Sequence, residues 1–304
     1  MKALGDFLLR LALLPVRALG RLPLGLARAL LRPLAPTLRL LMRRRRAVVA
    51  RNLALCFPER EEGERNALCR AHFRHLADSL AETAVVWCRP GRFDRRFGEL
   101  VGLQHLRAAQ ASGCGVLMLT GHVTCIELGA RLVGESVTAR AIYRPLRQPV
   151  LEAFQNQGRA RYAEAMIARD DVRAMVRHLR AGGVLWYAPD QDFGPERSAF
   201  APFFGLPTAT PTGLVDLVRL GRARVVPMYP LKLPDGRVQV HFEAAWEDYP
   251  SGDTEADLAR FNAFLERYVR LNPPQYWWLH RRFKTAPPGT ADRYASAAPP
   301  NPGS

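Results

Sequence analysis

Short apolar runs with the length of β-strands alternate along this chain with longer segments that have helical spacing. Three strands are predicted, in chain order GVLMLT (115–120), ARAIYR (139–144) and GVLWYAP (183–189). The first and third are almost continuously apolar, as in strands buried on both faces of a sheet. Segments 224–233 and 238–246, joined by the turn PDGR, predict a hairpin. Helices are predicted over residues 60–88, 102–112, 124–134, 148–168, 170–181, 210–221 and 254–271. This alternation predicts an α/β fold, with a mixed sheet flanked by helices on both faces.

The length of the chain and its cysteines limit how it is stabilised. A chain of 304 residues makes one large domain or two small ones, and it buries about three quarters of its unfolded surface. Disulfides and structural metals are therefore not needed. The five cysteines are scattered, and no two form a C-x-x-C pair, which argues against a disulfide framework and a zinc site. We expect a reducing compartment that faces the cytoplasm.

Positive charge dominates the composition. The net charge is +16, and only three of the 44 basic residues are lysines, so that nearly all are arginines. The planar guanidinium fork pairs bidentately with phosphate and carboxylate groups. The balance indicates a polyanionic partner, such as an anionic membrane, a phosphorylated substrate, an acidic protein or a nucleic acid.

The first 42 residues are rich in leucine and carry regularly spaced arginines. These recur at intervals of 7, 4, 7, 4 and 7 residues, at Arg10, Arg17, Arg21, Arg28, Arg32 and Arg39. On a helical wheel they fall within about 60° of one another, which leaves a broad apolar face. The pattern predicts helices lying in a membrane interface, with apolar side chains among the acyl chains and guanidiniums among headgroup phosphates. The alternative is an amphipathic segment that packs on the body of the protein.

Other features of the amino terminus favour an interfacial segment over a membrane span. A span over residues 11–30 would bury three arginines in hydrocarbon, at a cost on the order of 8 kcal/mol. A secretory signal is not expected, because the apolar runs are short and no cleavage site follows. Four prolines would break the segment into short helices, at Pro15, Pro23, Pro33 and Pro36.

Changes in composition divide the chain into three parts. Residues 1–46 form the membrane-associating helical segment, whose final basic run, 43–46, would lie at the cytoplasmic headgroup surface. Residues 47–288 form the main domain. Residues 289–304 are rich in proline, glycine, alanine and serine, which predicts a disordered tail.

Polar side chains follow three of the predicted strands. His122 comes after the first strand, Arg144 ends the second, and Asp190 follows the third. Ligands of such folds bind beyond the carboxyl ends of the strands. We therefore expect these three side chains to meet at one edge of the sheet.

His122 and Glu127 have the spacing H-x-x-x-x-E. Within one helix the two would point about 140° apart, so a contact requires His122 in the turn before the helix and Glu127 reaching back from its first turns. Gly121 suits such a turn. In that geometry the carboxylate would orient the imidazole, and the other ring nitrogen could remove a proton from a substrate hydroxyl. The alternative is two unrelated polar residues at the edge of a core.

The surrounding motifs add candidate residues to this edge. Asp190 and Asp192 suggest a cation site, but no histidine or glutamate at useful spacing joins them, and we expect no metal. Arg144, Arg147, Arg159 and Arg161 could bind phosphate or an oxyanion, or form a solvated helix face, which suits Arg147 and Arg161 better. Cys125 lies inside the histidine motif, where we expect it to pack as a small residue rather than act as a nucleophile.

Taken together and in order, these motifs resemble one family. RNLALCFPER (51–60), LTGHVTCIELGAR (119–131), IYRPL (142–146), QGRAR (157–161), WYAPDQDFGPERSAFAPFFG (186–205), TPTG (210–213) and QYWWLHRRFKTAPPG (275–289) are similar to motifs of the late acyltransferases of lipid A biosynthesis, the group that acts on (Kdo)2-lipid IVA. The resemblance implies a glycerolipid-acyltransferase-like α/β fold in the main domain, which would be the acyltransferase domain. It also implies transfer of a fatty acyl chain from acyl carrier protein to the hydroxyl of a hydroxyacyl chain on a phosphorylated glycolipid, at the cytoplasmic face of the inner membrane, without a metal or cofactor.

The resemblance also implies roles for particular residues. His122 matches the general base and Glu127 its orienting partner, while Arg159 and Asp190 match further residues associated with activity. We assign Arg159 to phosphate or oxyanion contact and Asp190 to organisation of the site. Further candidates for substrate contact are Arg144, Gln191, Asp192, Arg281 and Arg282. The family commonly has a single amino-terminal membrane helix, from which the arginine-bearing segment departs.

Three other interpretations remain open at this stage. The acceptor could be a glycerophospholipid or another glycolipid. The charge could serve a nucleic-acid-binding module, but no ribonucleoprotein-type motif is present, so no nucleic-acid partner is expected. A membrane scaffold without catalysis would leave the ordered motifs unexplained. No G-x-S-x-G elbow occurs, which favours direct attack of the hydroxyl on the thioester, without a covalent enzyme intermediate.

Overall fold

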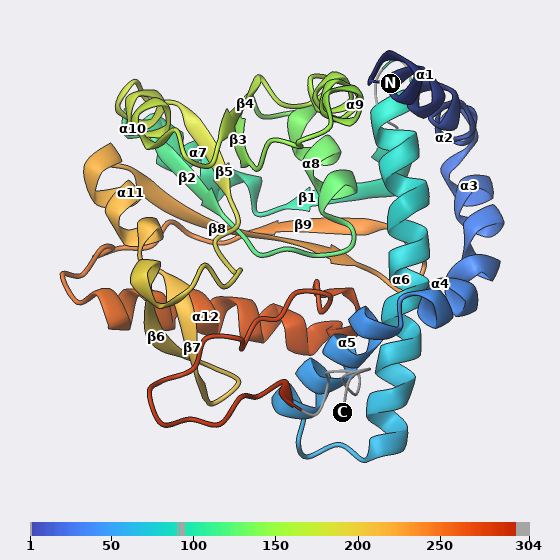
Figure 1. The fold of residues 1–304 in the computed structure, drawn as a ribbon. Helices are drawn as coiled ribbons and strands as arrows, with labels where there is room; N and C mark the ends of the chain where they lie inside the picture. Colours follow the sequence, from blue (N-terminus) through green and yellow to red (C-terminus); the bar gives the residue numbers. More distant parts are fainter. Residues whose placement is uncertain (1, 90, 92–94, 296–304) are drawn as a thin grey trace.

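A seven-stranded sheet organises the main body of the protein. The computed structural model describes residues 2–89, 91 and 95–295 (Figure 1). The strand order is β1-β9-β8-β2-β5-β3-β4, and every neighbouring pair is parallel except β8 and β9. The strands are β1 (Gly98–Val101), β2 (Val116–Leu119), β3 (Arg140–Tyr143), β4 (Ala165–Ala168), β5 (Val184–Tyr187), β8 (Arg224–Lys232) and β9 (Val238–Phe242). The predicted mixed sheet is confirmed.

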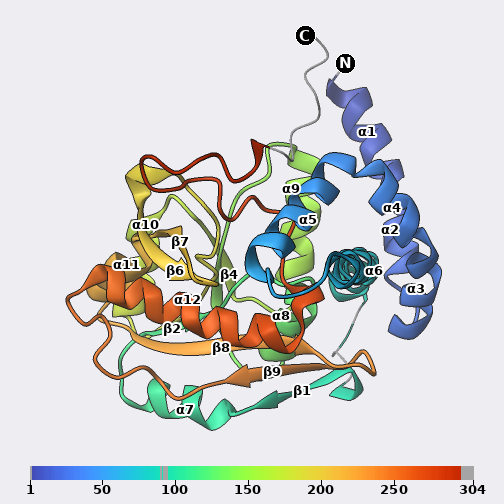
Figure 2. The same cartoon turned by 90° about the horizontal axis from the view of Figure 1, so that it is seen from below.

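Helices cover both faces of this sheet. Figure 2 shows β1, β8 and β9 between α7 on one side and α12 on the other. The body helices are α6 (Glu62–Cys88), α7 (Leu103–Ala111), α8 (Ile126–Gly134), α9 (Pro149–Arg159), α10 (Val172–Arg180), α11 (Gly213–Gly221) and α12 (Thr254–Leu271). The central strand β2 is completely buried along its length, as its continuous apolar sequence predicts.

Parts of the fold differ from the sequence prediction. The predicted helix 148–168 ends at Arg159, and Ala165–Ala168 forms the edge strand β4. Alanine and methionine favour helices in isolation, but pairing with β3 decides their conformation here. The strand β1 and the antiparallel hairpin of β6 (Ser198–Phe203) and β7 (Leu206–Pro211) were also not predicted.

The amino terminus forms a chain of short helices, of which the second, third and fourth pack along α6. They are α1 (Lys2–Ala12), α2 (Leu14–Leu19), α3 (Leu24–Leu31), a 3-10 turn (Arg32–Leu34) and α4 (Ala35–Leu41), followed by α5 (Arg43–Cys56). Pro15, Pro33 and Pro36 lie in the first turns of their elements, and Pro23 precedes α3, so the predicted interruption by prolines is confirmed. In Figure 2, which looks along α6, α2, α3 and α4 lie on the side of α6 away from the sheet.

Two arginines of the stripe point toward the body instead of toward lipid headgroups. Arg28 pairs with Glu82 at 2.8 Å, and Arg32 pairs with Asp78 at 2.8 Å. The Nζ atom of Lys232, on β8, contacts both carboxylates. Since buried acids require positive partners, both guanidiniums pair with α6. The expectation of a place among headgroup phosphates is wrong for Arg28, which is buried, whereas the side chain of Arg32 is 55% exposed.

The apolar side chains of the same helices face outward. Ten of them are between 44% and 76% exposed: Leu4, Phe7, Leu8, Leu11, Leu14, Leu26, Leu30, Leu34, Leu40 and Leu41. We call these residues the leucine face. None of the helices in the described residues is both long enough and apolar enough to cross a bilayer.

The expected segment boundaries fall within packed structure. Helix α5 continues through residue 46 without a break. Tyr294, beyond the expected boundary at 288, is fully buried, and the backbone N–H of Phe283 donates to its hydroxyl oxygen at 3.2 Å. Tyr294 therefore packs on the body, residues 289–292 are exposed, and 296–304 of the predicted disordered tail lie outside the described residues.

Candidate functional site

His122 lies in the turn between β2 and α8, as its sequence position predicts. Strand β2 ends at Leu119, and α8 begins at Ile126. The turn is tied to the carboxy-terminal segment, because the Trp277 backbone N–H donates to the His122 carbonyl at 3.0 Å. Gly121 permits a close approach: a Cβ there would lie 3.1 Å from Oδ2 of Asp190. The backbone around His122 is thus fixed from two sides.

The partner of the His122 ring is Asp190, in place of the expected Glu127. The Nδ1 atom of His122 lies 2.5 Å from Oδ1 of Asp190, and the His122 backbone N–H donates to Oδ2 at 2.8 Å. Parallel strands β2 and β5 are neighbours, so the residues that follow them meet at the carboxyl edge of the sheet. The predicted convergence of His122 and Asp190 is correct, and the predicted pairing of His122 with Glu127 is corrected.

The pair is electrostatically coupled. Burial would lower the pKa of His122, but the charge of Asp190 and its hydrogen bond raise the pKa above its ordinary value, against the opposing charge of Arg159. Burial would raise the pKa of Asp190, but His122 and then Arg282 hold it below its ordinary value. Because an ionised carboxylate can only accept, Nδ1 of His122 is the donor, and Nε2 is the basic nitrogen.

The two side chains differ in their access to solvent. The side chain of His122 is 35% exposed, whereas that of Asp190 is 2% exposed. A buried carboxylate behind a partly open imidazole is the arrangement in which the exposed ring nitrogen can exchange a proton with a bound molecule.

Glu127 belongs to a second cluster on the same side of the sheet. Its Oε1 accepts from Nε and Nη2 of Arg159, at 3.1 and 2.5 Å. Its Oε2 accepts from Trp87 Nε1 at 2.9 Å and from the hydroxyl of Tyr162. Glu127 lies in the first turn of α8, and its carboxylate binds Trp87 on α6 and Arg159 on α9 instead of the His122 ring. We call these four residues the Glu127 cluster.

Sequence reasoning missed Trp87 and Tyr162. Trp87 lies 40 residues from Glu127 in the chain, and Tyr162 lies 35 residues away. Tyr162 directly follows the QGRAR motif, which could have signalled it, but no local spacing connects Trp87 with Glu127.

The other candidate residues after β5 organise loops. The Asp192 carboxylate accepts from the Thr285 backbone N–H at 2.7 Å and from its hydroxyl at 2.9 Å. The Asp192 backbone N–H donates to Nε2 of His280 at 3.0 Å. Asp192 therefore ties the loop after β5 to the carboxy-terminal segment. Gln191 is half-buried, and Arg144 is exposed after β3, so their contact with substrate stays a prediction.

The two carboxy-terminal arginines have different surroundings. Arg282 is 1% exposed, and its guanidinium donates to the Ala209 carbonyl at 2.5 Å and to Thr210 Oγ1 at 3.0 Å. Such a buried guanidinium cannot hold acceptor phosphates, which corrects the expectation for Arg282. The Cζ atom of Arg281 lies 4.8 Å from the ring centre of Tyr294, and its phosphate contact stays a prediction.

Cys125 packs as the sequence indicates. It is fully buried, and its Sγ lies 3.6 Å from the Pro230 carbonyl oxygen. Burial raises its pKa to about 12. A thiol with such a pKa is not ionised near neutral pH, which disfavours a nucleophilic role.

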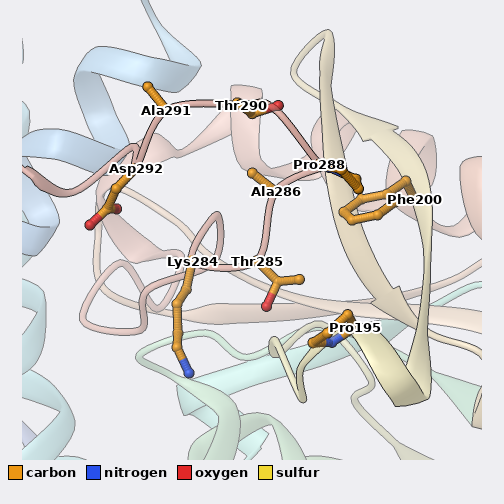
Figure 3. A pocket seen from close by; sticks show the side chains of 9 residues that line it. All are labelled: Pro195, Phe200, Lys284, Thr285, Ala286, Pro288, Thr290, Ala291 and Asp292. Atoms are coloured by element: carbon orange, nitrogen blue, oxygen red, sulfur yellow. The ribbon is translucent and has the colours of Figure 1, made fainter.

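A cavity of about 530 Å³ lies beside Thr285, the residue that binds Asp192. Figure 3 shows the side chains around it. It is lined by Pro195, Phe200, Lys284, Thr285, Ala286, Pro288, Thr290, Ala291 and Asp292. Thr285 connects this cavity to Asp192, but His122 and the Glu127 cluster do not line it.

Comparison with known proteins identifies the family of this chain. Residues 2–285 match the family described as bacterial lipid A biosynthesis acyltransferase. The lipid A biosynthesis lauroyltransferase of Escherichia coli (strain K12) is 38% identical over 92% of this chain and 90% of that protein. The palmitoleoyltransferase of the same organism is 35% identical over 83% of each chain, and a lipid A biosynthesis acyltransferase of Haemophilus influenzae is 35% identical over 80% of this chain and 79% of that protein. The resemblance seen in the sequence motifs is confirmed: this chain belongs to the bacterial lipid A biosynthesis acyltransferases.

Proposed function

We propose that this acyltransferase moves a fatty acyl chain from an acyl carrier protein thioester to a hydroxyacyl hydroxyl of a lipid A precursor such as (Kdo)2-lipid IVA. The observation that carries this proposal is the His122 imidazole, whose Nδ1 is bound by the buried Asp190 and whose ring is partly open. Membership of the family supports the acceptor class.

His122 acts as general base in the proposed reaction. Its Nε2 takes the proton of the acceptor hydroxyl as the oxygen attacks the thioester carbonyl carbon. The resulting imidazolium is stabilised by Asp190. The imidazolium of His122 then returns the proton to the leaving thiolate as the carbon–sulfur bond breaks, which yields the ester and the carrier thiol. This direct transfer requires no covalent enzyme intermediate.

Arg159 stabilises negative charge in the proposed mechanism. Its guanidinium is held on one side by Glu127 through Nε and Nη2. Nη1 of Arg159 takes no part in these two bonds to Glu127 and can donate to the thioester oxyanion or to an acceptor phosphate. Glu127 thus contributes by orienting Arg159.

The positive charge of the protein suits both substrates. Acyl carrier protein is acidic, and the acceptor carries phosphate and Kdo carboxylate groups. A net charge of +16 attracts such partners before contact is made.

The leucine face supports docking of the protein on the cytoplasmic face of the inner membrane. Side chains such as Leu26, Leu30 and Leu34 would enter the acyl region, while the exposed arginines of the run 43–46 would meet anionic headgroups. We propose this interfacial mode in preference to a single-pass anchor, because the arginines within residues 24–34 pair with acids of α6 while Leu26, Leu30 and Leu34 stay exposed.

Replacement of leucines tests this docking. Burial of a leucine stabilises membrane association by about 2 kcal/mol, so Leu26→Ser, Leu30→Ser and Leu34→Ser together should weaken binding to phosphatidylglycerol-containing vesicles at least about tenfold in co-sedimentation. Leu220→Ser, at a similarly exposed leucine on α11, is the matched control and should bind as the parent does. Equal binding of the triple variant and the control would refute docking by the leucine face.

An acceptor panel tests the proposed reaction. The full chain is supplied with acyl carrier protein thioesters of several chain lengths and with (Kdo)2-lipid IVA, glycerol 3-phosphate or lysophosphatidic acid, and products are identified by mass spectrometry. We expect acylation of the lipid A precursor alone. Transfer to a glycerol-based acceptor alone would overturn the proposed acceptor.

A further inference from the structure

The carboxylate of Glu127 is held by different donors at its two oxygens. Among the described residues, Oε1 accepts from Arg159 alone, whereas Oε2 accepts from Trp87 Nε1 and from the Tyr162 hydroxyl. The side chain of Glu127 is 13% exposed and that of Arg159 is 21% exposed. Little water is therefore available to replace a lost donor, so the orientation of Glu127 depends on all three residues.

Packing against α9 fixes the indole of Trp87. It lies in the last turn of α6, and its ring packs edge-on against Phe154 of α9, with ring centres 5.6 Å apart. Gly158 provides the space for the indole, because a Cβ at this position would lie 2.4 Å from Cγ of Trp87. The Cζ atom of Arg159 lies 5.8 Å from the centre of the same ring. One indole thus donates to Glu127 and packs beside its cationic partner.

Tyr162 supplies a donor that does not titrate near neutral pH. Burial and the charge of Glu127 raise its pKa well above the ordinary value, so the hydroxyl keeps its proton. Trp87 Nε1 also lies 3.3 Å from the Tyr162 hydroxyl oxygen, which joins the two donors. The oxygen of the Tyr162 hydroxyl accepts from the indole N–H, and its O–H donates to Glu127.

We propose that Trp87 and Tyr162 are positioning residues for the Glu127–Arg159 pair. They hold Oε2 of Glu127, so that Oε1 fixes Nε and Nη2 of Arg159 and directs Nη1 toward developing charge on the substrate. This inference rests on the proposed function, because it assigns a purpose to Arg159 in acyl transfer. A packing role alone would require the two rings but neither of their polar hydrogens.

Two conservative aromatic substitutions test the proposal. Tyr162→Phe and Trp87→Phe keep an aromatic ring at each position and delete a donor to Glu127. We expect kcat to fall about tenfold in each, as for loss of an orienting hydrogen bond in an active site, while KM for the acceptor stays within about twofold. Steady-state kinetics, normalised to the folded fraction from circular dichroism, measure both constants.

Matched controls remove the same groups elsewhere. Tyr249 is a half-buried tyrosine whose hydroxyl has no hydrogen-bond partner in the described part of the chain, and Trp246 packs against it with ring centres 4.9 Å apart. Tyr249→Phe and Trp246→Phe should leave kcat unchanged. A fall in kcat in these controls equal to that in the test variants would overturn the positioning role.

A double-variant comparison tests whether Tyr162 acts through Arg159. Lysine at 159 keeps the charge but loses the bidentate fork, so Tyr162→Phe should cost less than about twofold in kcat when Arg159→Lys is already present. An equal loss in both backgrounds, or parental kcat in Tyr162→Phe alone, would overturn the proposal. A parent protein that fails to acylate the lipid A precursor refutes the proposed function instead, so the two failures are distinguishable.

Discussion

Asp190 and Glu127 are two partly or fully buried carboxylates on the same side of one sheet, yet they bind different partners. Asp190 follows β5 and contacts His122, which follows the neighbouring strand β2. Glu127 lies in the first turn of α8 and contacts Arg159 at the end of α9. The difference shows that adjacency in the sheet, rather than closeness in the chain, selects the partner of the histidine. It also separates two tasks: Asp190 controls the base, and Glu127 controls a cation.

Among the variants of these two groups, His122→Ala should lower kcat the most. His122→Ala deletes the group that takes the acceptor proton, and general-base catalysis contributes about 10² to 10⁴ in rate. We expect kcat to fall within that range while the circular dichroism spectrum stays unchanged. Activity within about threefold of the parent would exclude His122 as the base.

Asp190→Asn should have the next largest effect and should change the pH dependence. The basic form of His122 is required, so activity falls as the pH drops through the His122 pKa, which Asp190 raises. Loss of the carboxylate charge should therefore move the acidic limb of the kcat profile to lower pH and reduce kcat about 10²-fold. A limb that stays in place, or moves to higher pH, would contradict the assigned partner.

Glu127→Gln should have a smaller effect on kcat and a different signature. The amide keeps the shape of the side chain but weakens the hold on Arg159, so we expect kcat to fall about tenfold. Because Glu127 does not contact His122, the acidic limb should move less than in Asp190→Asn. Kinetics from pH 5 to 9 on both variants compare the two carboxylates directly, and a larger shift in Glu127→Gln would reverse their assigned tasks.

Much of this fold could be predicted because burial determines its sequence pattern. The strands β2 and β5 are continuously apolar, and the long helices α6 and α12 were recognised with nearly correct ends. The edge strand β4 could not be recognised, since three of its four residues are alanine or methionine, which favour helices, and pairing with β3 makes the segment extended.

Some members of the candidate site could be predicted, but their pairings could not. His122 and Asp190 were expected at one edge, because parallel strands place their carboxyl ends together. The partner of His122 was misassigned because a spacing of five residues carries no information about β5. Trp87 was missed for the same reason, since α6 approaches Glu127 only in the folded chain.

The partners of the amino-terminal arginines could not be predicted from local spacing either. The arginine spacing could not show that α6 carries Asp78 and Glu82, which pair with two of these arginines. Since a buried pair outcompetes solvent only when both partners are in place, the direction of the stripe depends on residues about 50 positions away in the chain.

The ring proton of His122 offers the most direct test of its pairing with Asp190. In protein labelled with ¹⁵N-histidine, we expect His122 to be protonated at Nδ1 and basic at Nε2, with a downfield Nδ1 proton at neutral pH. That resonance should be lost or moved upfield in Asp190→Asn and be retained in Glu127→Gln. Its retention in Asp190→Asn together with its loss in Glu127→Gln would contradict the account and restore Glu127 as the partner of the histidine.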